Sequence, residues 1–232
     1  MKMIEHYTIE KFVIFIEIHD LVKYVYIFYM HKLATRSENQ LETRRKNFRE
    51  IVDILDDLKL DFFLEGGVLL GAIREKDFIK WDWDVEIAFL SDEFTKKFDD
   101  VLKRLEESGF TIMNYNNNFH HLKINIYKND APDITSFSLF GWSYNRYIKS
   151  FVRKDIRIPE KFIFNMKKIN FLDRLIYVPT PAKEYLEYKY GDWMTPLKSS
   201  EKTVYLTKGH YKKNSFNLAL NIDKLIKKLF KN

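Results

Sequence analysis

The hydrophobic residues of this chain change their spacing several times, and each change predicts a new secondary-structure element. After the polar segment 34–40, apolar side chains recur at helical spacing, which predicts a helix that buries one face. These side chains are Leu41, Phe48, Ile51, Leu55 and Leu58. A short apolar run at 62–64 then predicts a strand, and the apolar segment 68–73 predicts the start of a second, buried helix.

From residue 82 onward the period becomes two, because acidic and apolar residues alternate. The alternation predicts a strand with one apolar face and one acidic face. Val85, Ile87 and Phe89 form the apolar set, and Asp82, Asp84 and Glu86 form the acidic set. Ser91, followed by two acidic residues, predicts the start of a helix, and Gly109 predicts its end.

The next part of the chain is predicted to be mainly strands. Strands at 110–115 and 119–127, joined by an asparagine turn, are followed by a strand at 133–140. The aromatic and basic segment 141–170 has no assignable pattern, and one further strand is predicted around 169–178.

Two more helices are predicted toward the C-terminus. Pro181 opens a helix over 182–190, which Gly191 ends, and the last helix covers 216–230. The chain shows no internal repeat and no low-complexity linker. The simplest account is one mixed α and β domain with helical ends.

The N-terminal segment 12–30 is nearly long and apolar enough for a membrane span, yet it carries charges at its centre. Glu17, Asp20 and Lys23 would each cost roughly 2.5–3.5 kcal/mol there, and with His19 they share about half of a helical wheel. We therefore expect an amphipathic helix that packs on the domain, with peripheral contact to a membrane surface or a partner as alternatives. Because no basic stretch with a small-residue cleavage site precedes it, we expect no cleavable signal peptide and a cytoplasmic protein.

Composition narrows the chemistry only slightly. Lys and Arg total 39 against 33 acidic residues, a formal charge of +6. The lysines are scattered and concentrate only in the C-terminal tail, so a solvated basic surface accounts for them, as would an enzyme that handles phosphates or a weak nucleic-acid binder. The absence of cysteine excludes disulfides, thiolate zinc sites and a cysteine nucleophile. With only 7 glycines, a glycine pair is informative.

The acidic face of the predicted strand at 82–89 favours a metal. Three carboxylates on one face repel one another, and each loses free energy when it is desolvated. A divalent cation removes this repulsion, and carboxylate oxygens suit Mg²⁺ or Mn²⁺. On its own an Asp-x-Asp pair is also typical of a solvated strand face, so the prediction depends on the residues around it.

A glycine turn precedes this strand. Gly66 and Gly67 separate a predicted strand from a predicted helix, so backbone N–H groups at the start of that helix can approach a phosphate. Arg74 can add a bidentate phosphate contact. A glycine pair alone more often serves a turn or packing, but before an acidic strand it predicts a site that handles nucleotides.

The segment 66–87, GGVLLGAIREKDFIKWDWDVEI, resembles the signature of the LicD family, which includes fukutin and fukutin-related protein. That signature pairs a Gly-x-Leu-Leu-Gly-Ala-x-Arg element with a Trp-Asp-x-Asp-x-Asp strand. A second segment at 178–196, VPTPAKEYLEYKYGDWMTP, is similar to the family's closing Pro, Tyr-Leu, Tyr-Gly and Trp element. The resemblance covers residues 41–200, a single-domain span, and leaves 1–40 as an amphipathic helical extension and 201–232 as a basic helical tail.

The resemblance implies an α+β nucleotidyltransferase fold, with a mixed sheet flanked by helices and extra N- and C-terminal helices. It also implies transfer of a phosphorylated alcohol from a CDP-linked donor to an acceptor hydroxyl, usually on a glycan. LicD proteins transfer phosphocholine, and fukutin-type members transfer phosphoribitol. Mg²⁺ or Mn²⁺ would bridge the donor pyrophosphate and neutralise charge on the departing CMP.

The resemblance also assigns roles by position. Asp82 and Asp84 are metal ligands and catalytic residues, and Gly66, Gly67 and Arg74 line the donor phosphates. Asp133 matches a later carboxylate of the family, so it would complete the metal site or accept the acceptor's proton; a turn-capping aspartate after Pro132 is the alternative.

Three residues depart from the family pattern and leave the donor open. Glu86 stands where the family often has Asp, and it reaches the metal or turns aside. Val68 replaces a common Thr, and Trp83 replaces a frequent polar residue. Without cysteine, the cysteine-bound zinc of fukutin-related protein cannot form here.

Several polar residues are weaker candidates. His120 and His121 could supply a base or a phosphate contact, although such histidines are more often partly exposed strand residues. Lys123 shares a strand face with His121 and could meet a phosphate, with surface solvation as the alternative. Asp192 is expected to be no more than an acid at a helix end. Packing is the favoured role for the aromatic residues Trp81, Trp83, Tyr188, Tyr190 and Trp193. Stacking on cytosine is the alternative for the two tryptophans at 81 and 83, and a part in donor binding is the alternative for the other three.

Two other functions use the same residues. An enzyme of the same fold could transfer the nucleotide itself to a protein, RNA or small molecule, because a glycine turn before an acidic strand serves that chemistry too. A catalytically inactive family member could instead bind an anionic glycan, membrane or nucleic acid through its basic surface. The clustered arginines and aromatic strand motifs of nucleic-acid proteins are missing, so we do not expect a nucleic-acid partner.

Overall fold

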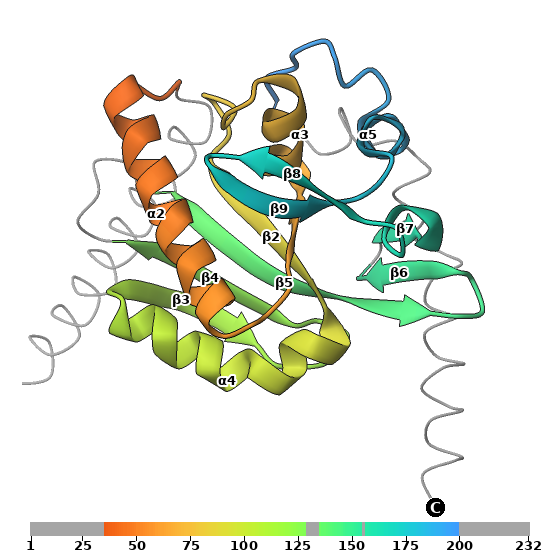
Figure 1. The fold of residues 1–232 in the computed structure, drawn as a ribbon, viewed down its shortest axis with the longest axis horizontal. Helices are drawn as coiled ribbons and strands as arrows, with labels where there is room; N and C mark the ends of the chain where they lie inside the picture. Colours follow the sequence, from red (N-terminus) through yellow and green to blue (C-terminus); the bar gives the residue numbers. More distant parts are fainter. Residues whose placement is uncertain (1–34, 129–134, 155, 200–232) are drawn as a thin grey trace, which may run out of the picture.

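The computed structural model describes residues 35–128, 135–154 and 156–199 (Figure 1). The strands are β1 (Phe63–Glu65), β2 (Asp84–Leu90), β3 (Phe110–Asn116), β4 (Lys123–Lys128), β5 (Ser136–Asn145), β6 (Ser150–Arg153), β7 (Ile156–Pro159), β8 (Lys167–Phe171) and β9 (Arg174–Val178). The helices are α2 (Glu38–Asp57), α3 (Gly66–Arg74), α4 (Ser91–Glu107), the 3₁₀ turn η1 (Glu160–Phe162) and α5 (Ala182–Tyr190).

The strands form one mixed sheet in the order β3-β4-β5-β2-β1-β9-β8, and β6 and β7 branch from the end of β5. The β2–β5 and β1–β9 pairs are parallel, and the other neighbouring pairs are antiparallel. This sheet with helices against it confirms the predicted fold class. The N- and C-terminal helices expected at 12–30 and 216–230 lie outside the described residues.

Helix α2 forms where the apolar spacing predicts it and begins slightly earlier, at Glu38. Ser37 and Gln40 cap its N-terminus reciprocally, because each side chain accepts a hydrogen bond from the other's backbone N–H, at 3.3 and 2.9 Å. The buried face includes Leu41 and Phe48, both fully inaccessible. Phe48 meets Phe78 and Phe171 edge to face, so α2 packs on the loop after α3 and on β8.

Helices α2 and α4 lie over one face of the sheet (Figure 1). Residues that face each other across the sheet share a side, so the register Leu64–Ile87–Leu139–Ile124 marks one apolar row beneath the helices. All four side chains are fully buried. The predicted alternation is confirmed from Asp84 onward, because Val85, Ile87 and Phe89 are all inaccessible, as a strand with one covered face requires. The strand begins two residues later than predicted, since Asp82 and Trp83 precede it.

The structure corrects the prediction of one strand at 169–178. That segment contains the end of β8, a turn and the whole of β9, so it belongs to a hairpin rather than to one strand. The hairpin turns at Leu172 and Asp173, whose φ values are 53° and 64°. A two-residue hairpin turn with left-handed backbone at both central residues is of type I′, and its usual sequence is Asn-Gly or Asp-Gly. Leu-Asp carries no such signal.

Two more boundaries differ from expectation. The unassigned region 141–170 contains the end of β5, the β6–β7 hairpin and η1, so β5 continues to Asn145 and passes into a small second sheet. The strand predicted from residue 119 begins only at Lys123, because residues 119–121 form a turn in which the His121 N–H bonds the Asn118 carbonyl at 2.7 Å. Helix α5 and its end at Gly191 lie where predicted.

Candidate active site

The glycine turn and the acidic strand lie directly against each other. Strand β1 pairs with β2 so that Glu65 faces Glu86, and the chain then enters α3 at Gly66, whose φ is 66°. A Cβ atom on Gly66 would lie 1.5 Å from a carboxylate oxygen of Glu86, and one on Gly67 would lie 1.7 Å from a carboxylate oxygen of Asp82. No side chain fits there, so the first backbone units of α3 contact both carboxylates.

Asp82 is electrostatically strained in this arrangement. Burial raises the pKa of Asp82 to about 6, and the negative charge of Glu86 adds to the rise while Arg44 and Arg36 oppose it. Any cation that reaches this half-buried carboxylate stabilises its ionised form. Asp82 and Glu86 therefore form an acidic centre at the N-terminus of α3.

Arg44 fixes the backbone at this centre. Arg44 lies on α2 and is fully buried. Its Nε donates to the Thr135 hydroxyl and its Nη1 donates to the Asp82 carbonyl, both at 2.8 Å. Arg44 thus ties the start of β2 to the residue that precedes β5. Asp133, the predicted third acid, is two residues before Thr135 in the sequence and lies outside the described residues.

A row of polar side chains crosses the open face of the sheet from the acidic centre. The register aligns Glu65, Glu86, Ser138, Asn125 and Asn114 on five neighbouring strands. The Ser138 hydroxyl donates to Asn125 Oδ1 at 2.7 Å, and Asn125 Nδ2 donates to Asn114 Oδ1 at 2.6 Å. These hydrogen bonds pair the polar groups of the row with one another on the side of the sheet opposite the apolar row.

Glu65 is a residue that the sequence reasoning missed. It is 1% exposed, and Lys189 Nζ donates to both of its carboxylate oxygens, at 2.6 and 2.7 Å. The Tyr185 hydroxyl also donates to it, and burial together with the Glu65 charge raises the pKa of Tyr185. This buried ion pair joins α5 to the residue immediately before Gly66. Two features of the sequence could have indicated this contact: Glu65 follows a short apolar run, and Tyr185 and Lys189 lie one helical turn apart on the predicted helix.

Arg74 does not join the acidic centre. It lies eight residues along α3 from Gly66, about 12 Å at the rise of a helix. Its side chain is 8% exposed, and it donates to the Trp193 carbonyl and to Glu75, both at 2.9 Å. Arg74 therefore connects α3 to the segment after α5.

The weaker candidates fall into two groups. Lys123 and His121 line a pocket on the far side of β2 from α3. The aromatic residues of the closing segment pack, as predicted: Tyr188 lies against Phe162, and its hydroxyl donates to the Arg157 carbonyl at 3.1 Å. Asp192 accepts a hydrogen bond from the Thr195 hydroxyl at 2.7 Å and stabilises the turn after α5.

The acidic residues have the type of ligand atom that a hard divalent cation prefers. Asp82 and Asp84 offer carboxylate oxygens, and Mg²⁺ is usually held by one or two carboxylates together with substrate phosphates and water. Within the described parts of the chain, no three acidic or histidine side chains are grouped closely enough to hold a metal by themselves. The same parts contain no helix that is both long and apolar enough to cross a bilayer.

Comparison with known proteins agrees with this arrangement. The model of the family described as "LicD/FKTN/FKRP, nucleotidyltransferase domain" matches residues 59–181, more than half of the chain. Ribitol 5-phosphate transferase FKRP from Mus musculus is 27% identical over 165 residues, 65% of this chain and 32% of that protein. Lipopolysaccharide cholinephosphotransferase LicD from Haemophilus influenzae is 46% identical over 43 residues, 18% of this chain and 16% of that protein.

The chain thus spans about a third of the length of the FKRP relative that it matches. Among solved structures, the antibiotic-resistance factor ANT(2'')-Ia has a TM-score of 0.45 at 13% identity, over 81% of this chain and 88% of that one. The family match includes the glycine turn, the acidic strand and the strands between them and Pro181. The chain belongs to the LicD/FKTN/FKRP family and contains its nucleotidyltransferase domain.

Proposed function

We propose that this protein transfers a phosphorylated alcohol from a CDP-linked donor to an acceptor hydroxyl, with a glycan as the acceptor. The observation that carries the proposal is the contact of the α3 N-terminus with Asp82 and Glu86. The free N–H groups of a helix start attract phosphate, while the acids beside them attract a cation that itself binds phosphate. The two together suit the pyrophosphate of a nucleotide-linked donor.

The names of the relatives narrow the type of group transferred. One relative is a ribitol 5-phosphate transferase and another is a cholinephosphotransferase, so both move the phosphate ester of a small alcohol. The acceptor named for the second is lipopolysaccharide. These activities extend to the present chain by proposal, because the matched region is a minor part of each relative.

Asp82 and Asp84 would hold Mg²⁺ or Mn²⁺, and Glu86 is the next candidate ligand. The ion, when bound, would neutralise negative charge on the donor phosphates and on the departing nucleotide. Asp133 is proposed as the further ligand or as the base, because it precedes Ser136, the β2 partner of Asp84, by only three residues. Arg44 would keep the Asp82 backbone in place throughout.

The proposed reaction exchanges one phosphorus–oxygen bond for another. The acceptor hydroxyl oxygen forms a bond to the phosphorus of the phosphoalcohol, and the bond from that phosphorus to the oxygen bridging to CMP breaks. The bridging oxygen keeps the electron pair and leaves with CMP, while the acceptor's proton passes to a carboxylate base. The N–H groups of Gly67 and Val68, in the first turn of α3, would hold the donor phosphate.

Titration calorimetry with CDP-choline, CDP-ribitol and CDP-glycerol tests the proposal. With Mg²⁺ present, we expect one donor to bind wild-type protein and to bind Asp84→Asn at least tenfold more weakly. Asp100→Asn is the matched control, since Asp100 is an exposed aspartate on α4. Failure of all three donors to bind folded wild-type protein would refute the proposal.

The released product separates this reaction from nucleotide transfer. A phosphoalcohol transferase releases CMP and leaves the alcohol phosphate on the acceptor. A nucleotidyltransferase would instead leave the nucleotide on the acceptor, and mass spectrometry of the acceptor distinguishes the two. An acceptor that gains a nucleotide would favour the second function.

A further inference from the structure

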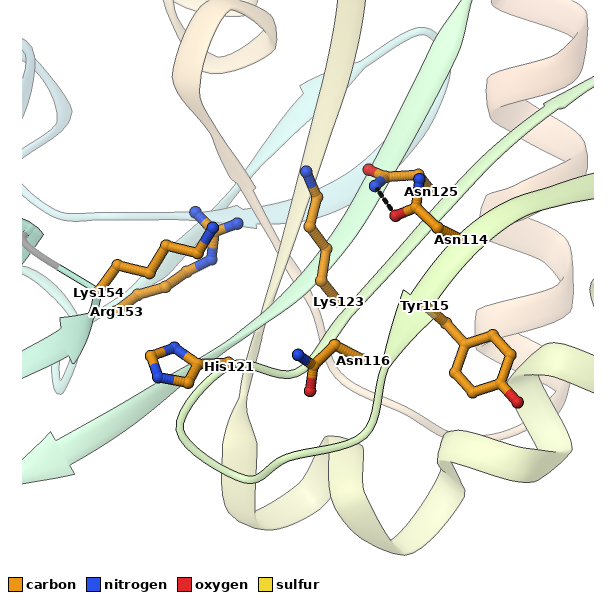
Figure 2. Close-up of a pocket in the computed structure, with 8 residues that line it drawn as sticks. All are labelled: Asn114, Tyr115, Asn116, His121, Lys123, Asn125, Arg153 and Lys154. Carbon is orange, nitrogen blue, oxygen red and sulfur yellow. Dashed lines mark hydrogen bonds between the residues drawn. The ribbon is translucent and has the colours of Figure 1, made fainter.

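A basic pocket lies across β2 from the α3 N-terminus. It has a volume of about 490 Å³, and β3, β4 and the β6–β7 hairpin contribute its walls. Figure 2 shows Arg153 and Lys154 reaching into the pocket from the β6–β7 hairpin and the Lys123 side chain between them and Asn125. His121 and the amides of Asn116 and Asn125 complete the polar lining.

In the part of the chain that the structure describes, the three cations of this pocket form no ion pair. Among the described residues, no carboxylate oxygen lies within 4 Å of the Lys123, Arg153 or Lys154 side-chain nitrogens. Arg153 is held by stacking, because its guanidinium carbon lies 3.9 Å from the centre of the Phe140 ring. Stacking fixes the plane of the guanidinium and leaves its N–H groups for a ligand.

The pocket adjoins the acidic centre, because the register aligns its residue Asn125 with Ser138 and, on the next strand, with Glu86. Burial lowers the pKa of Lys123, and the positive charges of Arg153 and Lys154 lower it further, while Glu86 and Asp84 act in the opposite direction. Burial likewise lowers the pKa of Arg153, and the negative charge of Glu86 is the largest of the effects that raise it. The three cations repel one another, so an anion stabilises them, just as a cation stabilises the neighbouring cluster of carboxylates.

The backbone of the β6–β7 hairpin presents Lys154 to the pocket. Arg153 pairs with Ile156, so only two residues form the turn, and Lys154 has a φ of 51°. A left-handed lysine costs about 1 kcal/mol or more relative to ordinary backbone, and the tight turn holds it there. The turn thus brings Lys154 to the same pocket as Arg153.

We propose that this pocket binds a phosphate monoester or diester carried by the acceptor, with Arg153, Lys123 and Lys154 as its ligands. The inference rests on the proposed function and adds that the acceptor is anionic. Phosphoryl transfer places the attacking and leaving oxygens on opposite sides of phosphorus. Helix α3 follows β1 on one side of β2, whereas β5, β4 and the β6–β7 hairpin lie on the other side. A donor phosphate at α3 thus leaves the basic pocket to the acceptor.

Calorimetry with glycerol 3-phosphate, and with glycerol as its uncharged analogue, tests the pocket directly. We expect wild-type protein to bind the phosphate and not glycerol, and Arg153→Gln to weaken phosphate binding about tenfold or more. Lys154→Asn should weaken it about threefold or more; asparagine tolerates left-handed backbone, so this variant keeps the turn if Arg153→Gln does not fold. Arg146→Gln is the matched control, because Arg146 stacks on Tyr147 outside the pocket.

CMP with Mg²⁺ is titrated in parallel, so that the two possible sources of phosphate are distinguished. The proposal predicts that Arg153→Gln and Lys154→Asn keep wild-type affinity for CMP. Weakened CMP binding with unchanged glycerol 3-phosphate binding would assign the pocket to the donor and overturn the proposal, as would phosphate binding that neither variant changes. If CDP-linked donors fail to bind while glycerol 3-phosphate binding still depends on Arg153, the proposed function fails and the phosphate pocket stands.

Discussion

At the scale of single residues, Asp82 is placed for a ligand at the expense of stability. Burial raises the pKa of Asp82 to about 6, whereas an aspartate in an unfolded chain titrates near about 3.9. A carboxyl group with a raised folded-state pKa adds stability while it is protonated, below about pH 4. That contribution is lost as the pH rises through about 6, so in metal-free protein the ionised Asp82 opposes folding at neutral pH.

Replacement by an uncharged isostere should reveal this effect. At pH 7 and without metal, we expect Asp82→Asn to raise the free energy of unfolding by about 1–3 kcal/mol. Near pH 4.5 the gain should largely disappear, because wild-type Asp82 is then protonated. Urea unfolding at both pH values in EDTA measures the difference, and Asp100→Asn should change stability little at either pH. A variant that is less stable than wild type at pH 7 would contradict the prediction.

Glu65 differs from Asp82, because its buried carboxylate is paired with the Lys189 ammonium group and therefore does not oppose folding. Lys189→Met would leave the Glu65 carboxylate without its cation, and the loss of one member of a buried pair costs about 3–5 kcal/mol. Lys183→Met, an exposed change on the same helix, should cost little. Chemical unfolding gives both values.

A double variant tests the cause of that loss. Glu65→Gln combined with Lys189→Met removes both charges, so it should recover a large part of the stability lost in Lys189→Met alone. Equal losses in the single and double variants would mean that Lys189 acts through packing rather than through Glu65.

At the scale of elements, the start of α3 depends on the absence of side chains. Gly66 and Gly109 both have left-handed backbone, with φ values of 66° and 78°. A Cβ atom on Gly66 would collide with the Glu86 carboxylate at 1.5 Å, whereas the nearest atom to a Cβ on Gly109 would be 4.0 Å away, on Lys128. Gly109→Ala should therefore cost only the backbone strain, about 1–2 kcal/mol, and leave ligand binding intact. Gly67→Ala has no such strain, yet its Cβ would displace the Asp82 carboxylate.

The three alanine variants separate strain from site geometry. We expect Gly66→Ala and Gly67→Ala to weaken Mg²⁺-dependent donor binding at least tenfold, and Gly109→Ala to leave it unchanged. Titration calorimetry on folded variants, checked by circular dichroism, gives the comparison. Donor binding that survives Gly67→Ala would show that the α3 N-terminus does not contact the ligand.

The elements that could be predicted from the sequence are those whose signals are local. Helix α5 starts at a proline and ends at a glycine, and β2 shows its alternation within seven residues. The β8–β9 hairpin could not be predicted, because its turn adopts left-handed backbone at Leu172 and Asp173 without glycine or asparagine. Tertiary packing, including the contact of Phe171 with Phe48, holds that turn closed.

The same distinction applies to the site. Gly66, Gly67, Asp82 and Glu86 are close in sequence and belong to a recognisable motif, so their association could be predicted. The Glu65–Lys189 pair joins residues 124 positions apart, and no local pattern reports such a contact. Arg74 is the converse case: its place in the motif predicts a phosphate ligand, and the structure gives its side chain Glu75 and the Trp193 carbonyl as partners at the C-terminal end of α3.

At the scale of the whole molecule, α2 organises the structure around the site. Ion pairs join it to four other regions: Arg45 to Asp77 in the loop after α3, Glu50 to Lys128 on β4, Asp57 to Arg104 on α4, and Asp53 to Arg174 on β9. The loop at 75–83 matters most for function, because it leads to Asp82. Arg45 and Arg44, adjacent on α2, bind the two ends of that loop.

The Arg45–Asp77 pair should therefore affect both stability and ligand binding. Burial favours the neutral form of Asp77, but hydrogen bonds from Arg45 and from the Phe78 N–H outweigh it and hold the pKa of Asp77 below its usual value. A carboxylate with a lowered pKa stabilises the folded state above about pH 4. That stabilisation is lost as the pH falls through the folded-state pKa.

Arg45→Met should lower the free energy of unfolding at pH 7 by about 1–3 kcal/mol, the cost of removing a partly buried charged hydrogen bond. Arg104→Met is the matched control from the same set of ion pairs. The Arg104 and Asp57 side chains are 44% and 69% exposed, against 15% and 27% for Arg45 and Asp77. The loss of the Arg104–Asp57 pair should therefore cost less than about 1 kcal/mol. Because the loop positions Asp82, Arg45→Met should also weaken Mg²⁺-dependent donor binding, whereas Arg104→Met should not. Equal effects of the two variants on donor binding would show that α2 supports the fold without positioning the site.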